Sequence, residues 1–379
     1  MSIRKMSNGR YQARVSYRDG VKYRQRSRMF KRKSEAELWE SNMKVDLNNG
    51  ADLKRRDISF ADYFCSWVEV YKTHGVSQHT NDMYLLTYKH LNAYFGGIKL
   101  TDISREDYQK FMNEFGENHG IATSRKTNQQ IRSAVQNALA DNIINRDFTF
   151  RVKVTGDKPK PQEDKFLDLD EYEKLRAYLI EHADFNSISN CMLLFQLETG
   201  CRFEEAAGIT WDHIDFNIGI ITINRQWVPR EHNFGPTKGN GQADGKITVP
   251  HSFLSFLTDL QQQATDYFAD QGLKYTKLNK LDLVFYSKWR TIITNDAANS
   301  ALRAICTKLD IKSVSSHAMR HTHASVLIQN GASLPYVQHR LRHKKLETTV
   351  NNYIHLIEKV NGESDQLTMK LMSKGFPKK

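Results

Sequence analysis

Six side chains in the second half of the sequence form a set that could act on a phosphodiester. Five are basic and the sixth is a tyrosine: Arg202, Lys238, His317, Arg320, His343 and Tyr353. Cationic groups stabilise the negative charge that a phosphoryl group gains in its transition state. A tyrosine hydroxyl can attack phosphorus and remain covalently attached to it. The set therefore predicts phosphoryl transfer with a protein nucleophile.

The local sequences around these residues resemble one known family. The segments are T-G-C-R-F-E-E at 199–205, P-T-K-G at 236–239, S-H-A-M-R-H-T at 316–322, L-R-H-K-K at 341–345 and T-T-V-N-N-Y-I-H at 348–355. Together they resemble the tyrosine recombinases, the phage-type integrase family, and the resemblance covers nearly the whole chain. One departure is Arg342, which stands where the family usually has glycine.

The resemblance implies a role for each residue. Tyr353 would join the 3′ phosphate of DNA and release a 5′ hydroxyl, without ATP. Lys238, on a flexible hairpin, would protonate the leaving 5′ oxygen. His317 would act in acid–base catalysis on the nucleophile, and His343 would donate to the phosphate. Arg202 and Arg320 would hold the non-bridging oxygens, with Glu205 orienting Arg202. Strand exchange through a four-way junction in a homo-tetramer is likewise implied by the family alone.

A metal site is the rival interpretation of the three histidines at 317, 321 and 323. On a helix, His317, Arg320 and His321 share a face. Arg320 would place a fixed cation beside the metal, and residues 316–331 contain no carboxylate to balance it. We therefore expect an anion there, with no metal and no other cofactor. The sequence also shows neither a GxxxxGK[ST] loop nor the clustered carboxylates of a two-metal nuclease.

The positive charge of the chain is concentrated at its start. Residues 1–56 hold 16 Lys and Arg against 6 Asp and Glu, whereas the rest of the chain holds 39 against 37. Such a basic module is typical of phosphate binding. Alternating apolar residues at 11–17 and 22–30, followed by a helix from Ser34, predict a small three-stranded sheet plus helix. This resembles an arm-site DNA-binding domain, with Arg14, Arg24, Arg26 and Arg28 on DNA-reading strands.

Two further units are expected after the basic module. Apolar residues at 3–4 spacing predict a helical bundle over residues 57–155, with Lys126 and Arg132 exposed on its last helix. It resembles the family's core-binding domain. Residues 156–165 form a linker, and 166–379 form a mixed α/β catalytic domain with a C-terminal tail that would dock on a neighbouring protomer. A helix ending at Gly200, strands at 220–228 and 247–250, and a helix within 316–331 that ends before Gly331 are expected there.

Composition sets the cellular context. The chain has 379 residues, 39% hydrophobic and 26% charged, and four cysteines without a CxxC pair, which favours a reducing compartment. No apolar run reaches the length of a membrane helix. We expect a cytoplasmic protein of a bacterial host that does not bind membranes.

We therefore predict a mainly helical α+β, multidomain, site-specific DNA recombinase that integrates or excises a mobile element. Its expected partners are double-stranded DNA with core and arm attachment sites, further copies of itself, and DNA-bending and excision factors. Two alternatives share the phosphotyrosine chemistry: a type IB topoisomerase and a chromosome-resolving recombinase. A non-catalytic DNA-binding regulator is disfavoured because all six residues are present.

Overall fold

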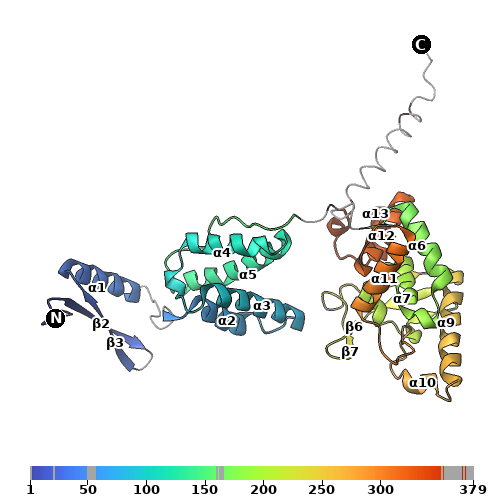
Figure 1. Ribbon diagram of the computed structural model, residues 1–379, viewed down its shortest axis with the longest axis horizontal. Helices are drawn as coiled ribbons and strands as arrows, with labels where there is room; N and C mark the ends of the chain where they lie inside the picture. The colour runs from blue at the N-terminus through green and yellow to red at the C-terminus, as the bar shows by residue number, and fades with distance from the viewer. Residues whose placement is uncertain are drawn as a thin grey trace, which may run out of the picture. The chain divides into compact units, whose positions relative to one another are not determined.

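The computed structural model describes residues 2–19, 22–48, 57–158, 161, 166–350, 353, 369 and 372. The chain divides into two compact units, residues 1–159 and 160–379 (Figure 1). The division falls within the expected linker, 156–165. Apart from residues 369 and 372, the C-terminal tail expected at 357–379 lies outside the described residues. In the parts of the chain that are described, no helix is long and apolar enough to cross a membrane.

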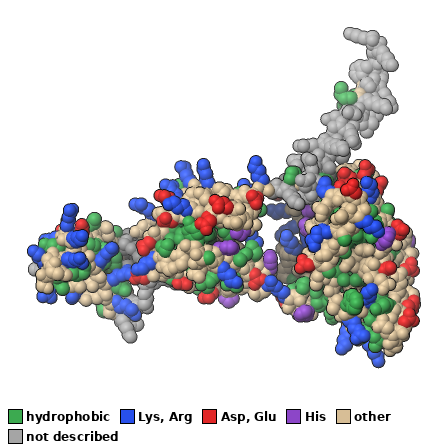
Figure 2. Space-filling model, viewed as in Figure 1, with side chains coloured by type: hydrophobic (Ala, Val, Ile, Leu, Met, Phe, Trp, Pro, Cys, Tyr) green, Lys and Arg blue, Asp and Glu red, His purple; other side chains and the backbone are tan. Residues whose placement is uncertain are grey.

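The first unit begins with a small sheet covered on one face by a helix. An antiparallel register joins the strands in the order β1-β2-β3. Val15 of the sheet packs with Met43 of the helix, and Trp39 and Leu47 close this small core. Figure 2 shows that most charged side chains on the visible face of this module are basic. Its elements are β1 Ile3–Lys5, β2 Tyr11–Asp19, β3 Lys22–Phe30 and α1 Lys33–Asn48.

The same unit continues as a helical bundle with a separate core. Ser77 and Ser104 cap the starts of their helices, because each hydroxyl accepts a hydrogen bond from the backbone N–H three residues later. Aromatic side chains such as Phe60, Phe64 and Tyr108 fill the interior. The helices are α2 Phe60–Tyr71, α3 Gln78–Phe95, α4 Arg105–Glu117 and α5 Ile121–Ala140.

The second unit is built around α7, Ile188–Thr199. Nearly every side chain of this helix is buried, as expected for a helix that is apolar on all sides. It packs against α6 Leu169–His182, α8 Phe203–Ala207, α11 Asn295–Leu309 and α12 Ser316–Gln329 (Figure 1). Other helices in the described part of this unit are α9 His251–Ala269, α10 Tyr275–Leu278 and α13 Leu334–Arg340.

The strands of the second unit form two small sheets, and here one prediction was wrong. Residues 220–228 are not a single strand. β5 Ile220–Ile223 pairs with β4 Ile214–Asp215 and β8 Gly245–Thr248, whereas β6 Gln226–Val228 pairs with β7 Asn233–Gly235. The chain changes sheets at Arg225, whose guanidinium bonds to the Thr210 hydroxyl and lies 4.2 Å from the Phe234 ring centroid.

Candidate active site

Arg202 is placed by the sharp end of α7. Gly200 ends the helix in the left-handed conformation, with φ of 68°. A side chain is excluded there, because a Cβ would lie 2.8 Å from the His323 ring. Arg202 then caps α8, and the Glu205 carboxylate holds it twice. One oxygen accepts from the Arg202 guanidinium at 2.6 Å and the other from its backbone N–H at 3.0 Å.

Arg320 lies beneath this junction on α12 and is 3% exposed. Its guanidinium donates to the carbonyl of Gly200 at 2.7 Å and to the carbonyl of Leu341. Burial, followed by the charges of Arg202 and Arg342, lowers the pKa of Arg320 to about 9. The side chain therefore stays charged at neutral pH while it joins the ends of α7 and α13 to α12.

One buried carboxylate, that of Glu205, interacts with several guanidiniums in this region. Glu205 is fully buried and also pairs with Arg342. Burial alone would raise the pKa of the Glu205 carboxyl, but the neighbouring guanidiniums outweigh it and hold that pKa below its usual value. Three arginines around one carboxylate leave a surplus of positive charge, which suits the binding of an anionic phosphate.

The two candidate histidines lie within the field of these arginines. Burial, then Arg320, Arg202 and Lys238, lower the pKa of His317. Burial, then Arg320 and Arg202, lower the pKa of His343 to about 3. Both imidazoles are therefore neutral at physiological pH, and a neutral ring still donates one N–H. The Nδ1 atom of His343 lies 2.9 Å from the Thr349 hydroxyl, which fixes the ring.

Lys238 lies in a tight turn that follows β7. The turn is closed by a 2.6 Å hydrogen bond from the Thr237 hydroxyl to Asp244. Gly239, Asn240 and Gly241 all have positive φ within it. The sequence placed Lys238 on the connection between two predicted strands, 220–228 and 247–250. In the structure the β6–β7 hairpin comes between β5 and β8, so Lys238 lies in the turn after this hairpin.

Tyr353 lies in a small apolar cluster and is 1% exposed. Its neighbours there include Ala324, Val337 and Leu341. Burial raises the pKa of the phenol, and the charge of Arg320 opposes that rise. The charge of Arg320 thus acts on Tyr353 as well as on both histidines. The tyrosine, the two arginines, the lysine and the two histidines therefore occupy one region of the second unit.

His321 is the residue at this site that sequence reasoning did not assign a role. Its Nδ1 atom lies 3.0 Å from the Tyr353 hydroxyl. The His317 ring centroid lies 5.1 Å from that of His321, which lies 5.9 Å from that of Tyr353. The i, i+4 spacing of His317 and His321 was the available signal, since it places both rings on one face of α12.

The four arginines proposed to read DNA lie on β2 and β3 but do not share a face. Residues directly opposite in an antiparallel pair point to the same side of a sheet. Arg14 pairs with Ser27 and is exposed on the open face. Arg24, Arg26 and Arg28 lie opposite Tyr17, Val15 and Ala13, on the side that α1 covers. Arg26 also pairs with Asp57.

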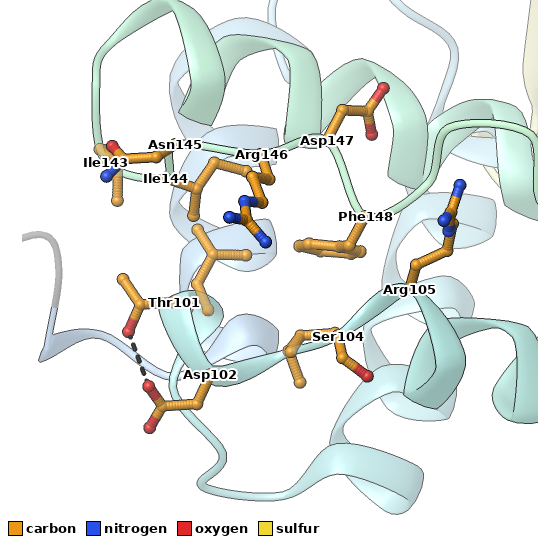
Figure 3. Close-up of a pocket in the computed structure, with 12 residues that line it drawn as sticks. Thr101, Asp102, Ser104, Arg105, Ile143, Ile144, Asn145, Arg146, Asp147 and Phe148 are labelled. Carbon is orange, nitrogen blue, oxygen red and sulfur yellow. Dashed lines mark hydrogen bonds between the residues drawn. The ribbon is translucent and has the colours of Figure 1, made fainter.

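In the helical bundle, the two basic candidates Lys126 and Arg132 are exposed on α5. A separate pocket of about 710 Å³ lies at the start of α4 and the segment after α5. Arg146 and Phe148 point into it (Figure 3). This pocket belongs to the first unit, whereas all six catalytic candidates belong to the second.

Comparison with known proteins assigns the family. The sequence profile of the Phage integrase family matches residues 165–359, and that of the phage integrase N-terminal SAM-like domain matches residues 59–116. The chain belongs to the phage integrase family. It is a tyrosine recombinase, and its catalytic candidates all fall within the matched region.

Similar proteins span nearly the whole length of this recombinase. The ICEBs1 integrase of Bacillus subtilis is 22% identical over 371 residues, covering 94% of this chain and 96% of that protein. The integrase of Staphylococcus phage L54a is 21% identical over 359 residues, covering 88% and 99%. The fold matches the Tn1549 transposon integrase bound to transposon right end DNA, with a TM-score of 0.66, 16% identity and coverage of 82% and 100%.

Proposed function

We propose that this recombinase integrates or excises a mobile element by cutting and rejoining DNA at specific sites, with Tyr353 as the nucleophile. The Tyr353 oxygen attacks the phosphorus and forms a bond to the 3′ phosphate, while the bond from phosphorus to the 5′ oxygen breaks. The phenol proton passes to an imidazole of the histidine pair at 317 and 321. Lys238 supplies a proton to the leaving 5′ oxygen.

The observation that carries this proposal is the shared position of Arg320. Arg320 lies one helical turn from His317 on α12. Its buried guanidinium donates to the carbonyl of Leu341, which packs in the same cluster as Tyr353 and lies two residues before His343. With Arg202 it would hold the non-bridging oxygens of a phosphate placed at the tyrosine. His343 would add a hydrogen bond to the same phosphate. The phosphotyrosine bond stores the energy of the broken linkage, so a 5′ hydroxyl from another strand can reverse the step without ATP.

We further propose that four copies act together on paired core sites in the bacterial cytoplasm. The N-terminal module would bind separate arm sites, and DNA-bending and excision factors would set the direction of the reaction. A solved lambda integrase tetramer is bound to a Holliday junction, and its chain matches this fold with a TM-score of 0.54. The basic N-terminal module favours a mobile-element recombinase over a topoisomerase, which would act on any supercoiled DNA.

The test is to trap the covalent adduct on nicked DNA from the element's ends and to map the linked residue. Tyr353→Phe should abolish the adduct while DNA affinity changes by no more than a few-fold, because only a hydroxyl is lost. Tyr336→Phe is the matched control, since Tyr336 lies nearby in sequence on α13 and is 47% exposed. Adduct formation by the Tyr353→Phe protein, or relaxation of any supercoiled plasmid without site preference, would refute the proposal.

A further inference from the structure

Arg342 has an unusual backbone and an unusual environment. Its φ is 56°, in the left-handed region that favours glycine. Its side chain is 2% exposed although it carries a full charge. Holding a long cationic side chain in both conditions is unfavourable unless its contacts compensate. Arg342 directly precedes His343 in the chain.

The contacts of Arg342 connect two separate segments of the active site. One guanidinium nitrogen pairs with Glu205, the carboxylate that also holds Arg202. Its Nε atom donates to the carbonyl of Ala243 at 3.2 Å. Ala243 ends the turn that carries Lys238, and the Thr237–Asp244 hydrogen bond closes that turn into one piece. The stem of the arginine packs against Gly245, where an added Cβ would lie 3.0 Å from Cγ and Cδ.

We propose that Arg342 is a positioning residue that anchors the Lys238 turn to Glu205. The inference rests on the proposed role of Lys238 as the acid for the leaving 5′ oxygen. The tip of the turn consists of residues with positive φ and lies outside both sheets. The position of the tip relative to Arg202 therefore depends on how the end of the turn, at Ala243 and Gly245, is held. Arg342 holds that end from a buried, fixed carboxylate. The exposed bond from Lys344 to Gln242, at 3.0 Å, adds a second and weaker contact.

The test uses a DNA substrate in which sulfur replaces the bridging 5′ oxygen. A thiolate leaves without needing a proton, so this substrate relieves a defect in the acid. Arg342→Gly keeps a residue suited to the positive φ and removes the whole side chain, with both its guanidinium contacts and its packing on Gly245. Because small misplacements of catalytic groups can cost about 100-fold, we expect a loss of that order on ordinary DNA. The loss should shrink to less than about 10-fold with sulfur, as it should for Lys238→Ala.

Two further variants and one control variant distinguish the proposed role from a folding defect. Arg342→Lys keeps the charge beside Glu205 but cannot donate to both partners in a fork, so we expect partial activity. Gly245→Ala leaves Arg342 in place and crowds its stem, so it should give the same sulfur-dependent defect. Lys345→Gln removes an exposed charge from the same segment and should cleave both substrates normally at saturating DNA.

The outcomes distinguish an error in the role of Arg342 from an error in the proposed function. If Lys238→Ala is relieved by sulfur but Arg342→Gly loses equally on both substrates, or loses nothing, Arg342 does not position the lysine. If the unaltered protein forms no adduct, or Lys238→Ala gains nothing from sulfur, the proposed function or the role of Lys238 within it is wrong.

Discussion

The Tyr353 hydroxyl lies 3.0 Å from the Nδ1 atom of His321, a histidine one helical turn beyond His317. A buried phenol resists ionisation, because burial raises its pKa. An imidazole nitrogen at hydrogen-bond distance from the hydroxyl is a suitable acceptor for the proton that must leave. The proposed nucleophile is thus joined to α12 through a group that can assist its activation.

We expect His321→Phe to slow adduct formation by about 100-fold or more, the usual contribution of a positioned acid–base group. Single-turnover cleavage at saturating DNA measures this effect. His317→Phe is the matched control on the same face of the helix. If only the His317 variant is slow, the proton does not pass through His321 and the contact is structural.

The two arginines should differ in what they contribute to folding. Arg202→Ala and Arg320→Ala should each reduce cleavage on the order of 100- to 1000-fold, as does the loss of other donors to a developing oxyanion. Only Arg320→Ala should also lower the melting temperature strongly. It leaves two buried carbonyls, those of Gly200 and Leu341, without their donor. In Arg202→Ala, Glu205 keeps Arg342 as a partner. Equal melting temperatures would contradict this division.

The protein should lose stability in acid because His323 is buried as a neutral ring. Its Nδ1 donates to the Leu197 carbonyl at 2.8 Å, and its Nε2 accepts from Arg340 at 3.0 Å. Burial, then Arg340, lower its pKa from 6.5 to about 3. The stability contributed by this neutral ring is complete above pH 6.5 and is lost as pH falls toward 3. The loss is about 1.4 kcal/mol per pH unit in that window.

Urea titrations of the full chain between pH 7 and pH 4.5 measure this dependence. His323→Gln keeps an acceptor for Arg340 but cannot take up a proton. The unfolding free energy of this variant should fall less steeply as the pH is lowered. Its slope should correspond to the uptake of up to one proton fewer on unfolding than in the unaltered protein. An unchanged slope would show that His323 is not responsible.

The N-terminal module should bind a second class of DNA site. Removing residues 1–56 should abolish protection of arm sites and reduce integration, while cleavage of an isolated core site survives. The module should bind with a steep salt dependence, because its basic groups displace counterions from phosphates. Footprinting along the element's end compares the two proteins. Identical footprints and equal recombination would reduce the module to a nonspecific basic tail.

Within that module, the register of the sheet predicts unequal roles for its arginines. Arg14 lies on the open face, whereas Arg28 lies on the side of α1 with its guanidinium 5.6 Å from the Phe30 ring centroid. Arg14→Ala should therefore weaken binding to arm DNA more than Arg28→Ala does. Fluorescence titration with an arm-site duplex measures both affinities. A larger loss for Arg28→Ala would place the DNA on the opposite side.

Local sequence signals predicted the elements well where the relevant contacts are also local. The helix end at Gly200 and the helix through His317 and Arg320 both depend on neighbours within a few residues. The break at Arg225 was missed because both sides of it keep the same alternating pattern. Only the pairing with β7 reveals that the chain has entered another sheet.

The supporting residues of the site were harder to predict for the same reason. His321 and Tyr353 are 32 residues apart, and Glu205 and Arg342 are 137 apart. No local pattern records such pairs. In Arg342 the sequence showed only a departure from the usual glycine, whereas the fold shows that its backbone keeps the glycine-like φ and its side chain takes on new contacts.

The order of the catalytic segments along the chain has a consequence during protein synthesis. Among the six catalytic candidates, Arg202 is synthesised first and Tyr353 last. Helix α7, at the centre of the second unit, is synthesised before both. A nascent chain can therefore bring together Arg202 and Arg320 only after α12 has emerged, and the proposed nucleophile Tyr353 follows 24 residues after the end of that helix, Gln329. A truncated translation product that ends before Tyr353 could occupy DNA but could not break it.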